Sequence, residues 1–87
     1  MYVIIVYDVS VGRVFKVCQF LRQYLNWVQN SVFEGELTES ELEKVKVGIK
    51  KIINLHEDSV IIYQLLTQKA FKKEHIGTKK AEPSLII

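Results

Sequence analysis

Short apolar runs alternate along the chain with stretches that repeat apolar residues at helical spacing. Tyr2–Tyr7 is a run of six apolar residues rich in β-branched side chains, which predicts a strand covered on both faces. Arg13–Leu25 and Leu37–Ile53 carry apolar stripes with a period near 3.6, so each predicts an amphipathic helix. Between them, Trp27–Leu37 alternates with period two but slips near Asn30–Phe33, which predicts one bent strand or two short strands.

Local signals mark the ends of the two predicted helices. Thr38 is followed three residues later by Glu41, the pattern of a capping box that starts a helix. Leu37 and Leu42 are spaced as the hydrophobic staple that accompanies such a box. Ser10 or Gly12 can start the earlier helix, and Asn26 is placed to end it.

The last third of the chain predicts one more buried strand and a basic extension. Ser59–Thr67 is strongly apolar, while Gln68–Gly77 is basic and partly extended in character. The order of elements predicts an α+β ferredoxin-like sandwich, with two helices on one face of an antiparallel sheet. We expect residues 1–78 to form this domain. The tail 79–87 ends on three aliphatic residues, and we expect it to pair with the sheet of a second subunit in a homodimer.

Composition narrows the classes of protein that remain. The chain has 87 residues and a single cysteine, Cys18, which excludes an intramolecular disulfide and a CxxC metal site. Its four glycines are scattered, so there is no phosphate-binding Walker loop. The apolar runs are too short to span a membrane, and no basic region precedes the first strand, so we expect a cytoplasmic protein.

Charge is distributed unevenly. Residues 1–43 carry a formal charge of −3 and residues 44–87 a charge of +5, for a net charge of +2. The basic half indicates either a polyanionic partner such as a nucleic acid or a solvated lysine-rich surface. Lysines acting on a nucleic acid would bind phosphates without reading sequence.

Asp8 is the main candidate for chemistry. It follows a buried strand directly and precedes a loop, a common position for a ligand or metal site. A carboxylate there can bind Mg²⁺ together with water and phosphate oxygens, or can simply cap the following helix. One carboxylate provides few protein ligands for a metal ion, but a two-fold dimer would supply two carboxylates. His56 and His75 lie in polar stretches without a paired carboxylate motif, which favours surface positions over catalysis.

Three segments together resemble CRISPR-associated protein 2, the small partner of the integrase that acquires CRISPR spacers. They are Tyr7-Asp8-Val9, Val28-Gln29-Asn30-Ser31-Val32-Phe33-Glu34-Gly35-Glu36-Leu37 and Asp58-Ser59-Val60-Ile61-Ile62-Tyr63. Their order and spacing match that family over nearly the whole chain, and His75-Ile76-Gly77 is similar to its final strand region.

This resemblance implies a ferredoxin-like homodimer with Mg²⁺-dependent endonuclease activity on single-stranded RNA or double-stranded DNA. It also implies a complex with the CRISPR integrase. The family's metal-binding aspartate corresponds to Asp8, and Tyr7, Ser31 and Phe33 belong to the same cleft. The loop after the aspartate is short here, and Arg13 is its one nearby arginine. Arg13 or a lysine is the candidate for stabilising charge on the phosphate. The alternative is a non-catalytic subunit that serves as a DNA-binding scaffold in spacer integration.

Overall fold

The computed structural model describes residues 1–66 and 70–78. In this part of the chain two helices and five strands follow one another in the order β1, α1, β2, β3, α2, β4, β5. Their bounds are β1 Tyr2–Asp8, α1 Val11–Leu21, β2 Asn26–Gln29, β3 Val32–Glu36, α2 Glu39–Ile52, β4 Ser59–Leu65 and β5 Phe71–Gly77.

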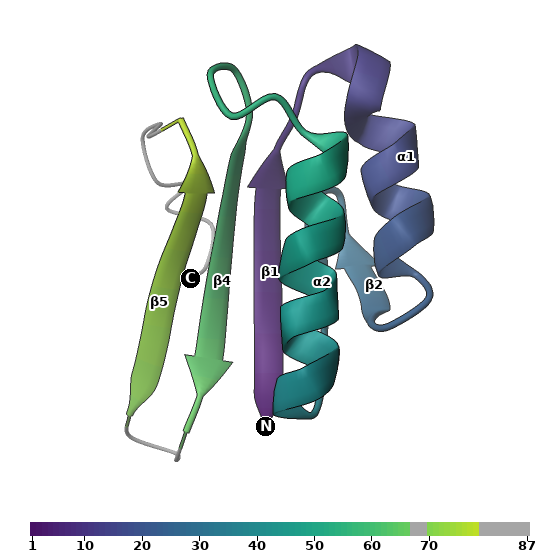
Figure 1. Cartoon of the computed structure of the whole chain (residues 1–87). Helices are drawn as coiled ribbons and strands as arrows, with labels where there is room; N and C mark the ends of the chain where they lie inside the picture. The colour runs from purple at the N-terminus through teal and green to yellow at the C-terminus, as the bar shows by residue number, and fades with distance from the viewer. Residues whose placement is uncertain (67–69, 79–87) are drawn as a thin grey trace.

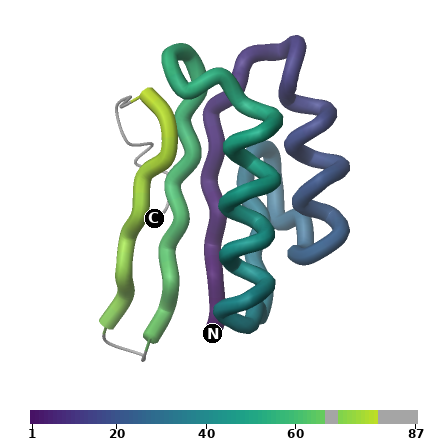
Figure 2. Tube along the Cα trace, in the orientation of Figure 1, coloured from purple at the N-terminus to yellow at the C-terminus, as the bar shows by residue number. Residues whose placement is uncertain are grey.

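The strands form one antiparallel sheet in the order β2-β3-β1-β4-β5. Both helices lie on the same face of this sheet, in front of it in Figure 1, and the trace in Figure 2 shows the two layers without side chains. The first four strands with the two helices have the ferredoxin-like arrangement, and β5 extends the sheet beyond β4. The predicted fold class is confirmed.

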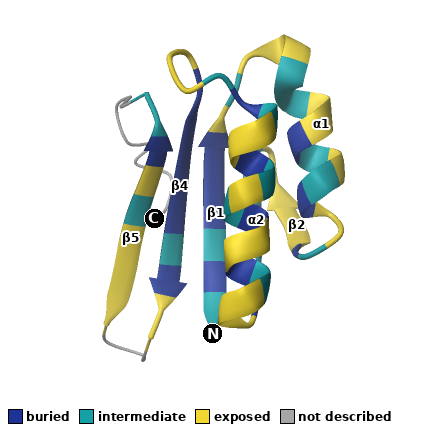
Figure 3. Ribbon diagram, viewed as in Figure 1, coloured by how far each residue is buried: buried dark blue, intermediate teal, exposed yellow. Residues whose placement is uncertain are grey.

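The central strand β1 is apolar on both faces, as its sequence predicted. Val3, Ile5 and Tyr7 belong to the core between sheet and helices, whereas Val6 is buried on the other face of the sheet. The strand pairs antiparallel with β3 on one side and with β4 on the other. We call the face without helices the open face. Figure 3 shows the buried residues of the helices turned toward the sheet.

The helix α2 matches its sequence signals closely. Thr38 Oγ1 accepts a hydrogen bond from the Glu41 amide at 3.1 Å, and Glu41 accepts one from the Thr38 amide at 2.9 Å. The predicted capping box is therefore confirmed. Leu42, Val45 and Ile49 form the buried stripe of this helix.

The predicted end of α1 at Leu25 is wrong, because the helix stops at Leu21. The amides of Gln23 and Tyr24 donate hydrogen bonds to the carbonyls three residues back, those of Phe20 and Leu21. This is the 3₁₀ pattern, so the α-helix ends before these residues. Leu25 is nevertheless buried in the core, which explains the apolar stripe that suggested a longer helix.

The segment after α1 is two short strands rather than one bent strand. A tight turn at Asn30 and Ser31 separates β2 from β3, and Asn30 has a left-handed backbone with φ of 39°. Asparagine tolerates this conformation better than most residues. The register of the two strands also shifts between Trp27 and Gln29, just before the turn.

The C-terminal part agrees with prediction as far as it is described. The strand predicted from Ser59 ends at Leu65, and the basic extension contains β5. The predicted tail 79–87 and its pairing with a second subunit lie outside the described residues. No helix among residues 1–66 and 70–78 is long and apolar enough to cross a membrane.

Candidate active site

Three of the predicted site residues meet where β1 ends. The Tyr7 amide donates a hydrogen bond to the Ser31 carbonyl at 3.0 Å, so the β2–β3 turn is attached directly beside Asp8. The rings of Tyr7 and Phe33 stack with centroids 6.1 Å apart and planes inclined by 26°. Both rings are buried, 4% and 0% exposed, and they form a rigid support under the end of the strand.

The side chain of Asp8 lies on the other side of the sheet from these rings. Successive residues of a strand face opposite sides, so Asp8 shares the open face with Val6, while Tyr7 faces the helices. Asp8 is exposed and stands directly opposite Ser59 of β4. The structure therefore presents this carboxylate to solvent on a strand that is paired on both sides.

Tyr7 is a supporting residue in this geometry. Burial is the main cause that raises the pKa of its phenol, and the nearby Cys18 adds to the effect. The phenol therefore stays protonated at neutral pH. Its position in the core keeps it away from the face that carries Asp8.

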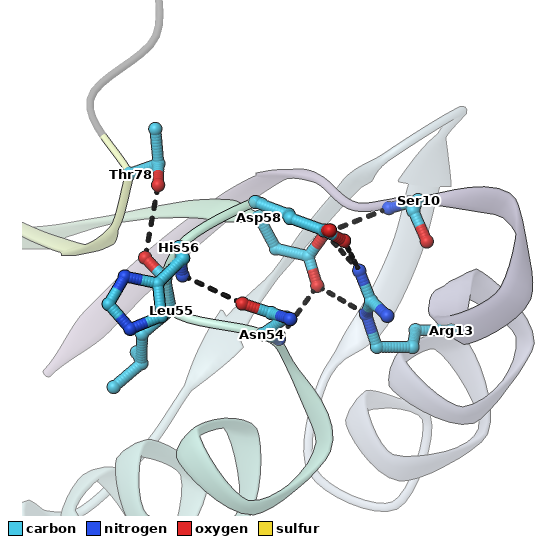
Figure 4. A network of polar contacts seen from close by, with 8 residues as sticks. Ser10, Arg13, Asn54, Leu55, His56, Asp58 and Thr78 are labelled. Carbon is cyan, nitrogen blue, oxygen red and sulfur yellow. Dashed lines mark hydrogen bonds and ion pairs between the residues drawn. The ribbon is translucent and has the colours of Figure 1, made fainter.

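Arg13, predicted to stabilise charge on the phosphate, is bound to two carboxylates (Figure 4). Its Nε donates to Asp58 Oδ2 at 2.6 Å, and its Nη2 donates to Asp58 Oδ1 at 3.1 Å and to Glu57 at 2.8 Å. These hydrogen bonds raise the pKa of Arg13 above its usual value. The guanidinium is thus already paired with two carboxylates of its own chain.

Asp58 is the functional-site neighbour that sequence reasoning missed. Its fully buried carboxylate also accepts hydrogen bonds from the amides of Ser10, at 3.0 Å, and Asn54, at 2.9 Å. The Arg13 side chain, before these amides, is the largest cause that holds the pKa of Asp58 well below its usual range. Asp58 therefore ties the loop after Asp8 to the turn before β4. The family-like segment begins with Asp58, but no local pattern in the sequence shows that this acid is buried while Glu57 is exposed.

Asp8 is the candidate metal ligand of this site. Among residues 1–66 and 70–78, no group of three or more His, Cys, Asp or Glu side chains lies close enough to hold one. Asp8 can still supply one carboxylate, and Mg²⁺ often takes only one or two carboxylates besides water and substrate phosphate. The donor chemistry of Asp8 fits Mg²⁺ as a partial site.

Both histidines lie at the surface, as predicted. His75 nevertheless makes a specific contact, because its Nε2 lies 2.8 Å from the Ser59 hydroxyl. His56 lies in the turn before β4, with its amide donating to the Asn54 side chain at 2.8 Å.

The lysines of α2 divide into two groups. Lys46 is mostly buried and pairs with Glu74 of β5 at 2.7 Å and with Glu43 at 3.5 Å. The remaining lysines of the helix are exposed, and these are Lys44, Lys50 and Lys51. Any phosphate contact made by α2 would therefore use the exposed group.

Comparison with known proteins points to one family. Residues 1–74 match the family model described as CRISPR associated protein Cas2. A protein of Archaeoglobus fulgidus named CRISPR-associated endoribonuclease Cas2 2 is 57% identical over 79 residues, covering 91% of this chain and 86% of that protein. The CRISPR-associated endoribonuclease Cas2 of Methanocaldococcus jannaschii is 60% identical over 80 residues, covering 92% and 70%. A solved crystal structure of Cas2 is similar with a TM-score of 0.74 and 44% identity, covering 100% of this chain and 98% of that one.

Proposed function

Because the chain belongs to the Cas2 family of CRISPR-associated proteins, we propose that it is a Mg²⁺-dependent endonuclease that cleaves single-stranded RNA. The names of its relatives, which call them endoribonucleases, favour RNA over double-stranded DNA as the substrate. The observation that carries the proposal is the exposed carboxylate of Asp8 at the end of the central strand.

The position of Asp8 suits a metal ligand. A carboxylate that binds a metal must hold its geometry while substrate enters and leaves. β1 is paired on both sides, and Tyr7 anchors its end through the Ser31 carbonyl and the Phe33 ring. These contacts supply the rigidity, while exposure of Asp8 leaves room for a phosphodiester.

The proposed active form is a homodimer that brings two Asp8 side chains together. The open face carries exposed apolar side chains suited to association: Leu65 is 38% exposed and Phe71 is 60% exposed. Tyr63 packs against Phe71 with ring centroids 5.7 Å apart. A second copy seated on this face would cover these residues and place its own Asp8 on the same side.

In the proposed reaction, the chain binds and orients the phosphodiester and the attacking water beside Asp8. A bound Mg²⁺ supplies positive charge that polarises the phosphate and acidifies water. We assign Arg13 to holding the loop after Asp8, since its guanidinium already pairs with Asp58 and Glu57. Tyr7 and Phe33 support the end of β1 from the core, and the Ser31 carbonyl holds its backbone by accepting the Tyr7 amide hydrogen bond.

We also propose that the protein works with the CRISPR integrase in spacer acquisition, as the family membership suggests. A scaffold without nuclease activity is the alternative to the enzyme. The exposed lysines of α2 lie on the helix side of the sheet, where they would suit the scaffold role by contact with a phosphate backbone.

The test is cleavage of labelled single-stranded RNA and double-stranded DNA by wild type, Asp8→Ala and Asp8→Asn, with Mg²⁺ and with a chelator. We expect wild type to cut RNA only with Mg²⁺, and both variants to lose cleavage while keeping their melting temperature and dimer mass. Glu39→Ala, which removes an exposed carboxylate from the first turn of α2, is the matched control and retains activity. Equal cleavage by wild type and Asp8→Ala would reject the proposed site. No cleavage by wild type on either substrate would favour the scaffold.

A further inference from the structure

A row of three polar side chains crosses the open face at the level where β1 ends. Asp8 of β1 stands opposite Ser59 of β4, and residues opposite each other in an antiparallel pair project from the same face. His75 of β5 lies opposite Ile61, two residues along β4 on that face, and its ring leans back to the Ser59 hydroxyl at 2.8 Å. The order across the sheet is Asp8, Ser59, His75.

The two new members of this row differ in exposure. Ser59 is 5% exposed, so its hydroxyl is a fixed and largely dry partner for the imidazole. His75 is exposed, which leaves the rest of its ring open to a substrate on the open face. An exposed imidazole anchored at one nitrogen by a buried hydroxyl has the arrangement of a base oriented by another group.

We propose that His75 is the general base of the endonuclease reaction and that Ser59 is the residue that positions it. This inference rests on the proposed function and adds a proton acceptor to it. In this proposal the Ser59 hydroxyl accepts a hydrogen bond from Nε2–H, which leaves the Nδ1 lone pair to take the proton.

The proposed step balances as hydrolysis. Nδ1 of His75 removes one proton from the attacking water, whose oxygen forms the new bond to phosphorus. The bond from phosphorus to the leaving sugar oxygen breaks, and that oxygen takes a proton from solvent. The imidazolium then returns its proton to solvent, and no oxidant or further reactant is needed.

The charged groups around His75 are poorly suited to the same task. Asp58, next to Ser59, points to Arg13 and is held ionised by it, with a pKa well below its usual range. Glu74 is bound to Lys46 at 2.7 Å. Lys73 and Tyr63, paired across β5 and β4, share the open face with His75, and Asp8 is the proposed metal ligand.

The first experiment compares RNA cleavage by His75→Ala, His75→Gln and Ser59→Ala, with Asp8→Ala as the inactive reference. We expect both His75 variants to lose kcat by about 10²–10⁴-fold, the usual contribution of a general base, with little change in KM for RNA. Added imidazole should restore part of the activity of His75→Ala and none of that of Asp8→Ala. His56→Ala, which removes the exposed histidine of the turn, is the matched control and stays at the wild-type rate.

The second experiment does not depend on activity. Nitrogen NMR of the histidine rings in the metal-free protein should show His75 as the Nε2–H tautomer in wild type. Ser59→Ala should shift the His75 signals toward a mixture of tautomers and leave those of His56 unchanged. A Nδ1–H tautomer in wild type, or no response to Ser59→Ala, would overturn the role given to Ser59.

The outcomes separate this inference from the proposed function. If wild type cleaves RNA, Asp8→Ala does not, and a folded His75→Gln cleaves at the wild-type rate, then the metal-site proposal stands and the role of His75 is overturned. Loss of activity in His75→Ala without any rescue by imidazole also overturns proton transfer. If Asp8→Ala is as active as wild type, the proposed function itself fails.

Discussion

Arg13 and Asp58 form an ion pair across 45 positions of sequence, with Arg13 Nε 2.6 Å from Asp58 Oδ2. The Asp58 side chain is fully buried, while the Arg13 side chain is 26% exposed and also reaches Glu57. The pair joins the first turn of α1 to the residue before β4. These two segments flank Asp8 and Ser59, which stand opposite each other in the sheet.

We predict that Asp58→Ala lowers the free energy of unfolding by about 3–5 kcal/mol, the range for removing one partner of a buried ion pair. The variant leaves Arg13 without its main partner and the amides of Ser10 and Asn54 without their acceptor. Urea denaturation measures the change. Glu57→Ala is the control, because this exposed partner of Arg13 should cost no more than about 1 kcal/mol. Equal losses in the two variants would contradict the assignment of Asp58 as the anchor.

We predict that stability falls as the pH drops below the usual pKa of an aspartate, about 4. The hydrogen bond from Arg13, followed by those from the Asn54 and Ser10 amides, lowers the pKa of Asp58 in the folded protein. The unfolded chain therefore binds a proton that the folded protein does not, so stability is full above this pH and is lost below it. Urea midpoints between pH 3 and pH 7 measure the slope. Asp58→Asn should flatten it, and an unchanged slope would assign the acid sensitivity to other carboxylates.

The parts of the fold that were predicted depend on neighbours in sequence. The apolar run of β1 and the Thr38–Glu41 capping box are local patterns, and the structure contains both. The slip of alternation before Phe33 marked the turn between β2 and β3, although the pattern could not choose between a bend and a turn. The apolar residue Leu25 misled the prediction of α1, because a buried side chain does not require a helical backbone.

The contacts of the candidate site depend on register between distant segments of the chain. The grouping of Tyr7, Ser31 and Phe33 was expected from the family resemblance alone, and the structure brings these residues together through pairing of β1 with β3. Burial of Asp58 and the Ser59–His75 contact arise only when β4 pairs with β1 and β5. No spacing within the sequence encodes such pairs, so Ser59 was predicted only as the start of a strand and His75 only as a surface residue.

We predict that Gly77→Ala destabilises the protein by at least about 2 kcal/mol. Gly77 has a φ of 96°, and a Cβ there would lie 2.1 Å from the Asp58 carbonyl oxygen. The left-handed backbone costs about 1–2 kcal/mol for a residue with a side chain, and the contact with backbone cannot relax by a rotamer change. Gly12→Ala is the control, since nothing lies within 4 Å of its Cβ position in α1, and helix propensity favours alanine. Gly77→Ala should lower the melting temperature, and Gly12→Ala should raise it. An unchanged melting temperature for Gly77→Ala would refute this packing.

We predict that Thr38→Ala lowers the free energy of unfolding by about 1 kcal/mol, the typical cost of losing an N-cap side chain. The variant removes the acceptor for the Glu41 amide, while the Thr38 amide can still donate to the Glu41 carboxylate. Hydrogen bonds from the backbone and side chain of Thr38 lower the pKa of Glu41, so the variant should raise this pKa part of the way toward its usual value. Urea denaturation and carboxyl NMR titration measure the two effects. Thr38→Ser keeps the hydroxyl, so it should retain both the wild-type free energy of unfolding and the lowered pKa of Glu41. Equal losses in the Ser and Ala variants would mean that the hydroxyl is not the cap.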